Sequence, residues 1–339
     1  MKKFLLQGLI VLAVAAFGVR NELQQVLQVL QVQIKLPDTY LELKPGANLS
    51  SLCRQWQQQQ LLTAWQCQQL KLQSLFNPQL RQLQAGVYPV KPMRLQQLLQ
   101  LLRSGKVAQF SLTIREGQTF AQNLQQLQQL PYLDADVADA DKARQLLRWP
   151  AEWGALPASA EALVFPDTYF YTAHTKLSVV LKRANQVLLE KLDAAWQSKQ
   201  GGLPLQNRYD LLTLASIVEK ETGYLPEKPL IAAVFINRLQ TKMKLQTDPT
   251  VIYGLGDRYQ GDIKREHLKD PHPYNTYVHA GLPPGPIALV SWGSLQAAAQ
   301  PAQSDKLYFV ARGDGTHQFS QSLAEHNKAV QQYIFGKKS

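Results

Sequence analysis

The chain begins with one long apolar run that can enter a membrane. The polar remainder must then fold on one side of that membrane. The run from Phe4 to Val19 is sixteen mostly apolar residues, bounded by Lys2-Lys3 and by Arg20. That length is typical of a signal-type segment, and the leading lysines favour an N-terminus inside. We therefore expect residues 1–20 to be a single-pass signal-anchor, with the rest outside the cytoplasm. Small residues could permit cleavage, but they lie inside the run, which favours an uncleaved anchor.

The charge balance indicates an acidic partner without identifying it. The 339 residues include 36 Lys and Arg against 25 Asp and Glu, a net charge of +11. Such a balance suits nucleic acid, a membrane surface or an acidic polymer. The cations are scattered and no nucleic-acid-binding signature is present, so nucleic acid is not an expected partner.

Neither the cysteines nor the histidines form a metal motif. Cys53 and Cys67 lack CxxC spacing, and they could pair in an oxidising compartment or remain two buried thiols. His267, His272 and His279 lack the spacing of a compact metal site. We expect no metal and no cofactor.

Two stretches of similar pattern suggest a repeated strand-turn-helix unit. They are LELKPGANLSSLC from Leu41 and LTIREGQTFAQNL from Leu112. Gly46 and Gly117 occupy equivalent places, where a strand-to-helix turn often needs positive φ. Asn48 and Thr119 are the expected N-caps of the helices that follow.

These units predict an α+β fold in four segments. Residues 1–20 form the anchor and Gln-rich residues 21–38 a stalk or linker. Residues 39–108, with a third unit after Pro92, form a small α+β module that resembles the glycan-binding LysM type, or a spacer of that shape. Residues 109–336 form a larger mixed α+β domain, closed by a hairpin around Gly313-Asp314-Gly315 and a terminal helix.

The stretch LLTLASIVEKETG, residues 211–223, predicts a helix with an acid among its apolar residues. At 100° per residue, Glu219 falls between Leu212 and Ala215, inside the apolar arc, and Glu221 falls on the opposite shoulder. Asp210 is the expected N-cap. A carboxyl held in an apolar wall would have a raised pKa and could act as a general acid. The alternative is a rim residue paired with an arginine.

Nearby loops carry the side chains that hold sugars. Tyr, Asn, Gln and Thr contact sugars by ring stacking and hydrogen bonds to hydroxyls. The chain has no GxSxG elbow, HExxH motif or phosphate-binding loop, so these groups and the lone acid remain. The predicted substrate-binding residues are Gln246, Thr247, Asp248, Tyr253, Tyr274, Asn275 and Tyr277.

Several ordered motifs resemble one family. The order ASIVEKET, VFINRL, LQTDPTVIYG, YNTY and GLPPGPI is similar to the endolytic murein transglycosylases of the YceG-like family, as are VFPDTYFYT and IREG. The sequence departs from that pattern after Ile287, where it reads ALVSWGS. The resemblance implies a single-pass protein of the inner (cytoplasmic) membrane with its catalytic domain in the periplasm. Its implied partners are peptidoglycan glycan strands, with the peptidoglycan synthases (penicillin-binding proteins) as candidates.

The resemblance also implies a reaction and places Glu219 at the catalytic position. Nascent glycan strands would be cleaved to 1,6-anhydro-N-acetylmuramic acid ends, which would terminate their synthesis. One carboxyl can suffice, because the 6-hydroxyl of the same muramic acid is the nucleophile and the acid then serves as base. A lysozyme-type muramidase is the alternative enzyme and would need a second carboxylate, Asp248 or Asp167. A non-catalytic peptidoglycan-binding scaffold is the alternative from another class.

Overall fold

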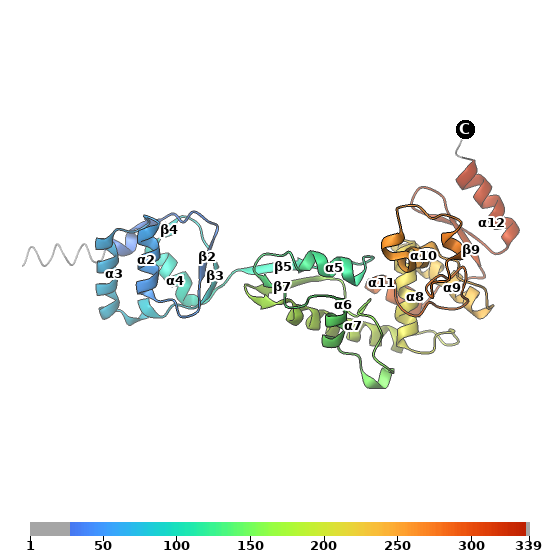
Figure 1. The fold of residues 1–339 in the computed structure, drawn as a ribbon, viewed down its shortest axis with the longest axis horizontal. Coiled ribbons are helices and arrows are strands. Elements are labelled where there is room, and N and C mark those ends of the chain that lie inside the picture. Colours follow the sequence, from blue (N-terminus) through green and yellow to red (C-terminus); the bar gives the residue numbers. More distant parts are fainter. Residues whose placement is uncertain (1–27, 337–339) are drawn as a thin grey trace, which may run out of the picture. The chain divides into compact units, whose positions relative to one another are not determined.

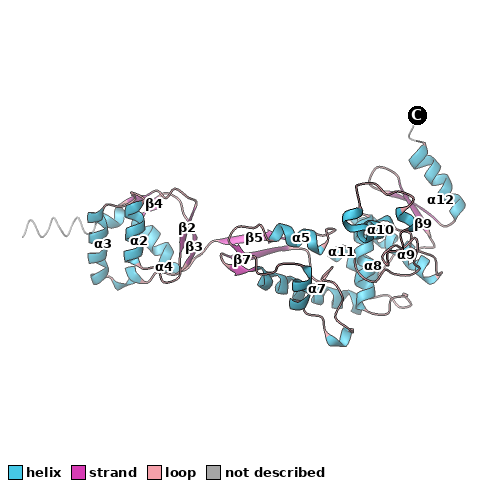
Figure 2. Ribbon diagram, viewed as in Figure 1, coloured by secondary structure: helices cyan, strands magenta, loops and turns pink. Residues whose placement is uncertain are grey.

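The structure is a computed structural model that describes residues 28–336. The expected anchor and residues 21–27 of the stalk lie outside the described residues. Within 28–336, no helix combines the length and apolar character needed to cross a bilayer. The chain divides into two compact units, the first ending at Phe110 and the second beginning at Ser111 (Figure 1). Both mix helices with short strands, which confirms the α+β class (Figure 2).

The first unit combines helices with two antiparallel strand pairs, β2–β3 and β1–β4. Its elements in chain order are the 3-10 turn η1 (Val29–Gln31), β1 (Gln33–Ile34), β2 (Tyr40–Leu43), α2 (Leu49–Gln58), α3 (Ala64–Phe76), η2 (Pro78–Arg81), β3 (Gly86–Pro89), β4 (Met93–Arg94) and α4 (Leu95–Ser104).

The two expected turns have the predicted local chemistry. Gly46 and Gly117 adopt φ of 78° and 68°, the left-handed region that glycine enters without steric cost. Asn48 accepts a hydrogen bond from the third residue of α2, and Thr119 does the same at α5 (Phe120–Leu127). These side chains satisfy backbone donors that a helix start leaves open, which is why the pattern could be predicted from sequence.

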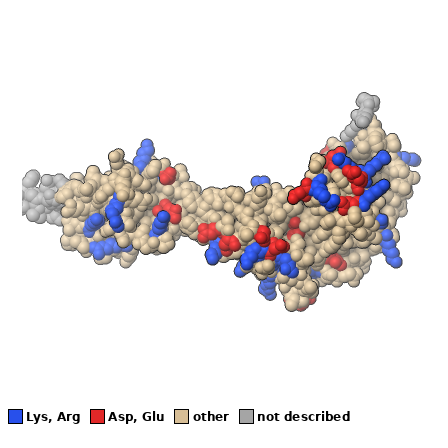
Figure 3. Space-filling model, viewed as in Figure 1, with Lys and Arg blue, Asp and Glu red and all other residues tan. Residues whose placement is uncertain are grey.

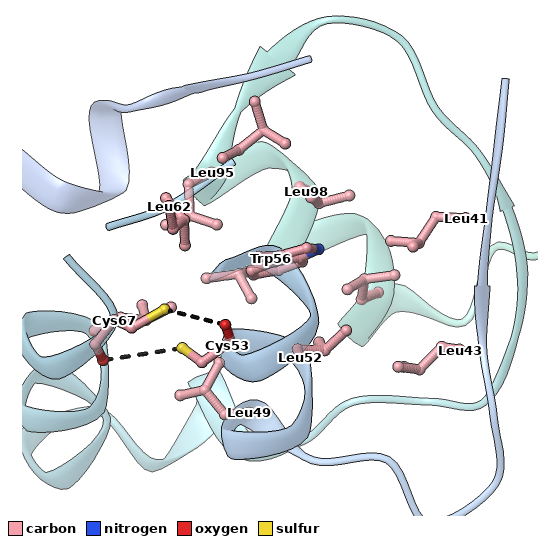
Figure 4. Close-up of a cluster of buried hydrophobic side chains, with 14 of the residues drawn as sticks. Leu41, Leu43, Leu49, Leu52, Cys53, Trp56, Leu62, Cys67, Leu95 and Leu98 are labelled. Atoms are coloured by element: carbon pink, nitrogen blue, oxygen red, sulfur yellow. Dashed lines mark hydrogen bonds between the residues drawn. The ribbon is translucent and has the colours of Figure 1, made fainter. Parts of the chain in front are cut away.

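The cysteines lie in the core of the first unit as free thiols (Figure 4). The Cys67 thiol donates to the Cys53 carbonyl at 3.5 Å, and the Cys53 thiol lies 3.9 Å from the Cys67 carbonyl. Burial raises the pKa of Cys53 to about 12, so its thiol is a packing group beside Trp56.

The second unit is built around helices, with short strand pairs at its edges. Strands β5 and β7 pair, β6 and β8 are parallel, and β9 and β10 form the predicted antiparallel hairpin. After β5 (Gln109–Thr113), which crosses the boundary, the elements are α5, β6 (Leu133–Asp134), α6 (Ala140–Leu146), η3 (Ala151–Trp153), β7 (Thr168–Thr172), β8 (Thr175–Lys176), α7 (Leu177–Gln197), α8 (Arg208–Glu221), η4 (Leu225–Glu227), α9 (Lys228–Gln240), α10 (Asp248–Leu255), η5 (Gly256–Arg258), η6 (His267–Lys269), α11 (Trp292–Ala299), β9 (Tyr308–Ala311), β10 (His317–Ser320), α12 (Leu323–Val330) and the π-helical turn η7 (Gln331–Phe335).

Helix α8 is the central helix of this unit. It contacts α7, α9, α10 and α11, and residues 211–218 are all buried. Even the polar Thr213 is therefore buried, whereas Lys220 is exposed. The N-cap is Asn207, three residues before the expected Asp210, whose side chain instead accepts from the backbone N–H of Gln206.

Candidate functional site

The carboxylate of Glu219 is enclosed by a cation and hydroxyl groups. Lys228 Nζ lies 3.1 Å from both carboxylate oxygens, and the two side chains are only 5% and 6% exposed. Ser291 donates through its backbone N–H at 3.0 Å and its hydroxyl at 2.5 Å, and the Ser294 hydroxyl donates at 2.6 Å. This buried cluster joins α8 to the starts of α9 and α11.

These contacts contradict the expected surroundings of Glu219. Burial alone would raise its pKa, but the hydrogen bonds from Ser291 and Ser294 and the charge of Lys228 outweigh that effect and lower the pKa below its usual value. The wall around Glu219 is polar and cationic, and the carboxyl is an ionised acceptor instead of a protonated acid.

The second glutamate of the motif has the properties that were expected of the first. Glu221 is the last residue of α8, and its carboxyl accepts a hydrogen bond from the Thr247 hydroxyl. Burial raises its pKa to about 7; the Thr247 hydrogen bond opposes that rise and the nearby Asp248 adds to it. A carboxyl with such a pKa exists in both protonation states near neutrality, as a group that is first acid and then base requires.

Glu221 also lines a cavity of about 360 Å³. The cavity brings together residues of α8, α9, the start of α10, the β9 strand and α12. Four of the predicted substrate-binding residues line it, namely Gln246, Thr247, Asp248 and Tyr277. The remaining lining residues are Arg238, Leu245, Tyr308, Phe309, Leu323 and His326.

The loop before α10 is held in an unusual conformation beside Glu221. Gln246 has φ of 48°, in the left-handed region that non-glycine residues seldom adopt. The backbone of Thr276 accepts from the Gln246 N–H at 3.2 Å, and the Thr276 hydroxyl accepts from the Thr247 N–H at 3.1 Å. These bonds fix the Thr247 hydroxyl against the carboxyl, which agrees with strained backbone being retained where surrounding contacts enforce it.

Tyr277 and Asn275 have different roles in the adjoining loop. The Tyr277 hydroxyl donates to Asp248 at 2.6 Å, so both line the cavity as a joined pair. Asn275 is 1% exposed, and its amide nitrogen donates to the carbonyls of His267 and Asp270. The geometry makes Asn275 a loop-ordering residue, and its contact with substrate stays a prediction.

Tyr253 and Tyr274 lie outside this cavity, in a second cluster of the same unit. The centroids of their rings are 4.8 Å apart, and the Tyr253 hydroxyl lies 3.3 Å from the carboxyl of Glu161. Glu161 is 4% exposed and also accepts from the Phe120 N–H, and burial raises its pKa to about 7. Sequence reasoning missed Glu161, because nothing in its local pattern shows that it is buried.

Two further groups missed from sequence are explained by their motifs. Arg238 comes from VFINRL and donates to the carbonyls of Leu245 and Leu307 at 2.7 Å each. These bonds fix the two segments that carry the cavity residues Leu245 and Tyr308. Ser291 and Ser294 come from ALVSWGS, where Ser291 also caps α11. This stretch therefore supplies the hydroxyl groups of the Glu219 cluster.

Comparisons with known proteins agree on one family. The model of the YceG-like family matches residues 41–332. A Bacillus subtilis protein named endolytic murein transglycosylase is 32% identical over 279 residues, covering 75% of this chain and 74% of its own. A Streptococcus pneumoniae protein of the same name is 28% identical over 287 residues, 75% of this chain and 51% of its own. A crystal structure of a YceG-like protein from Listeria monocytogenes matches 88% of this chain and 99% of its own, with a TM-score of 0.52 and 28% identity.

Proposed function

We propose, since the chain belongs to the YceG-like family and its relatives are named endolytic murein transglycosylases, that it is a lytic transglycosylase of peptidoglycan. The observation that carries the proposal is the carboxyl of Glu221, with a pKa of about 7, on a cavity lined by Tyr, Thr, Gln and Asp side chains. Such side chains bind sugar hydroxyls, and such a carboxyl can exchange a proton with a glycosidic oxygen.

The family resemblance places Glu219 at the catalytic position, whereas we assign the acid to Glu221, because Glu221 lines the cavity and Glu219 is not among its lining residues. The protonated carboxyl donates to the glycosidic oxygen as the bond to the anomeric carbon of muramic acid breaks. The 6-hydroxyl of the same sugar attacks that carbon and gives its proton to the Glu221 carboxylate, so the acid is regenerated in its starting form. The product is a 1,6-anhydro end, and no water is consumed.

Glu219 has a positioning role in the same mechanism. Its ion pair and hydrogen bonds tie the last turn of α8 to Lys228 and to the first turn of α11. The carboxyl of Glu221 leaves α8 two residues later, on another side of the helix. A fixed last turn therefore holds the acid beside Thr247.

A lysozyme-type muramidase is the second candidate, because Asp248 lines the same cavity as Glu221. Two carboxylates on one cavity are what glycoside hydrolysis uses. Asp167, the other acid considered for this role, does not line the cavity, and its carboxylate accepts from the Thr168 N–H at 2.7 Å.

Product mass separates the two candidates. Uncrosslinked glycan strands are digested with the purified protein, and the new reducing-side ends are weighed by mass spectrometry. A lytic transglycosylase gives muramic acid ends one water lighter than those of a muramidase. Hydrated ends would refute the transglycosylase mechanism. The lengths of the fragments would show whether cleavage is endolytic, because cleavage within a strand gives long fragments and cleavage from an end gives short ones.

The apolar N-terminal run and Lys2-Lys3 support anchoring in the inner (cytoplasmic) membrane, with both compact units in the periplasm. There the enzyme would cleave nascent strands beside the peptidoglycan synthases and so terminate their elongation. A reporter that works only after export should be active when it is fused at the C-terminus. Activity of a reporter that works only in the cytoplasm would refute the topology.

The strand-turn-helix pattern of residues 39–108, which resembles the LysM type, supports a glycan-holding role for the first unit. In that role the unit would hold the strand or position the catalytic domain. Deleting residues 39–108 should weaken binding to sacculi while leaving some cleavage of soluble glycan. Unchanged binding to sacculi would favour a spacer.

A further inference from the structure

Helix α3 of the first unit packs Cys67 and Leu70 into the core but exposes apolar side chains and buries polar ones towards its C-terminal end. Its buried residues include the polar Gln69, Gln73 and Ser74, whereas the apolar Leu75 and Phe76 are 62% and 83% exposed. A helix that only had to pack on its own core would place these groups the other way round. The exposed residues share a face, because Leu72, at 45% exposure, lies three and four residues before them.

The exposed face carries cations as well as apolar side chains. Leu72 and Leu75 line a cavity of about 630 Å³ with Lys71 and Arg81, both exposed. In the first unit, residues 28–110 hold nine Lys and Arg against two Asp and Glu, a net charge of +7. Blue atoms outnumber red ones on the face of this unit in Figure 3. Charge and apolar surface together fit an amphiphilic, anionic partner.

The position of α3 in the chain adds a third argument. The helix packs against η1, at the start of the described chain (Figure 1). Only eight residues, 20–27, separate the apolar run of the sequence from Gln28. Eight extended residues span at most about 28 Å, so α3 stays close to any bilayer that holds the run.

We infer that the face formed by Leu72, Leu75 and Phe76, with Lys71 and Arg81, docks on the surface of an anionic lipid bilayer. The aliphatic side chains enter the acyl boundary, and the two cations contact lipid phosphates. A lipid surface is favoured over a glycan because Lys71 and Arg81 flank the two leucines and the apolar run lies only eight residues before Gln28. The inference rests on the anchoring in the proposed function, and it adds a second contact that sets the first unit against the membrane.

A spin label at Leu75→Cys tests this placement in the full chain. The protein is reconstituted in nanodiscs of phosphatidylglycerol or of phosphatidylcholine, and collisions of the label with a water-soluble nickel chelate are measured. A label at Gln100→Cys, an exposed position on α4, is the matched control. The unsubstituted chain is the labelling blank, because Cys53 and Cys67 are no more than 1% exposed.

An interfacial helix buries its apolar side about 5–10 Å deep, so nickel collisions at Leu75 should fall about fivefold or more relative to Gln100 in the anionic discs. In the neutral discs the two labels should be similarly accessible. An accessible Leu75 label in anionic discs would overturn the inference, as would equal protection in both lipids, which would show that protection of the face does not depend on anionic headgroups.

The fraction of protein recovered with the discs distinguishes failure of the anchor from failure of the α3 surface. A chain lost from both discs would refute the anchor and this surface together, whereas a retained chain with an accessible Leu75 refutes the surface alone. Cleavage of soluble glycan by the labelled protein reports on the catalytic proposal independently.

Discussion

Replacing Lys228 with Met should destabilise the second unit strongly, because it leaves the Glu219 carboxylate buried without its cation. Both side chains are at most 6% exposed. Removing one partner of a buried ion pair costs about 3–5 kcal/mol of unfolding free energy. Glu219 keeps the Ser291 and Ser294 donors, so we expect the lower end, about 3 kcal/mol, or a fall in Tm of roughly 6–12 °C.

The loss should also depend on pH in a definite direction. In the wild type the folded pKa of Glu219 is lowered, so its stabilising effect is present above the unfolded pKa and is lost as pH falls through the folded pKa. In Lys228→Met the folded pKa of Glu219 rises, and protonation removes the buried charge at mildly acidic pH. The difference between variant and wild type should therefore shrink as pH falls from about 7 to about 4.5.

Urea unfolding followed by tryptophan fluorescence measures this difference at each pH. Lys182→Met, at an exposed position on α7, is the control and should shift the unfolding free energy by no more than about 0.5 kcal/mol. A Lys228→Met loss below about 1 kcal/mol at pH 7, or a loss that is equal at both pH values, would refute the proposed energetics of the cluster.

Two further predictions follow from the raised pKa values. Thr247→Val removes the hydrogen bond that opposes the rise at Glu221, so the basic limb of the pH–activity profile should move to higher pH; an unmoved limb would show that Glu221 is not the titrating acid. Glu161 has a folded pKa of about 7, above its unfolded value, so wild-type stability falls as pH rises between them. Glu161→Gln should match the wild type at about pH 4 and be more stable at pH 8 by up to about 3 kcal/mol, measured by urea unfolding; equal stability at both would contradict the buried acid.

Local side-chain chemistry made part of the fold predictable. The caps at Asn48 and Thr119 and the positive φ of Gly46 and Gly117 depend on residues within one turn, so the sequence contains their full cause. The hairpin of β9 and β10 was predictable for the same reason. The start of α8 was not, because Asn207 and Asp210 can both cap a helix and only the surrounding fold selects between them.

The surroundings of the two glutamates could not be predicted from helical periodicity. The prediction of an apolar arc around Glu219 assumed that one side of α8 faces water. Helices instead enclose α8, and even Thr213 is buried. What distinguishes the acids is the chemistry of distant elements. Lys228 and Ser291 face Glu219, and Thr247 faces Glu221, from segments that the periodicity of α8 does not include. The resemblance found the motif correctly, and the structure was needed to compare the acids within it.

The most direct test of the mechanism compares Glu221→Gln with Glu219→Gln on uncrosslinked glycan strands. Both variants keep the side-chain size and replace a carboxyl group with an amide that cannot exchange a proton, and urea unfolding gives the folded fraction of each. Corrected for that fraction, Glu221→Gln should lower the rate of anhydro-end formation by at least about a hundredfold, whereas Glu219→Gln should stay within about tenfold of the wild type. The reverse result, with cleavage lost in folded Glu219→Gln and retained in Glu221→Gln, would contradict the assignment of the acid to Glu221.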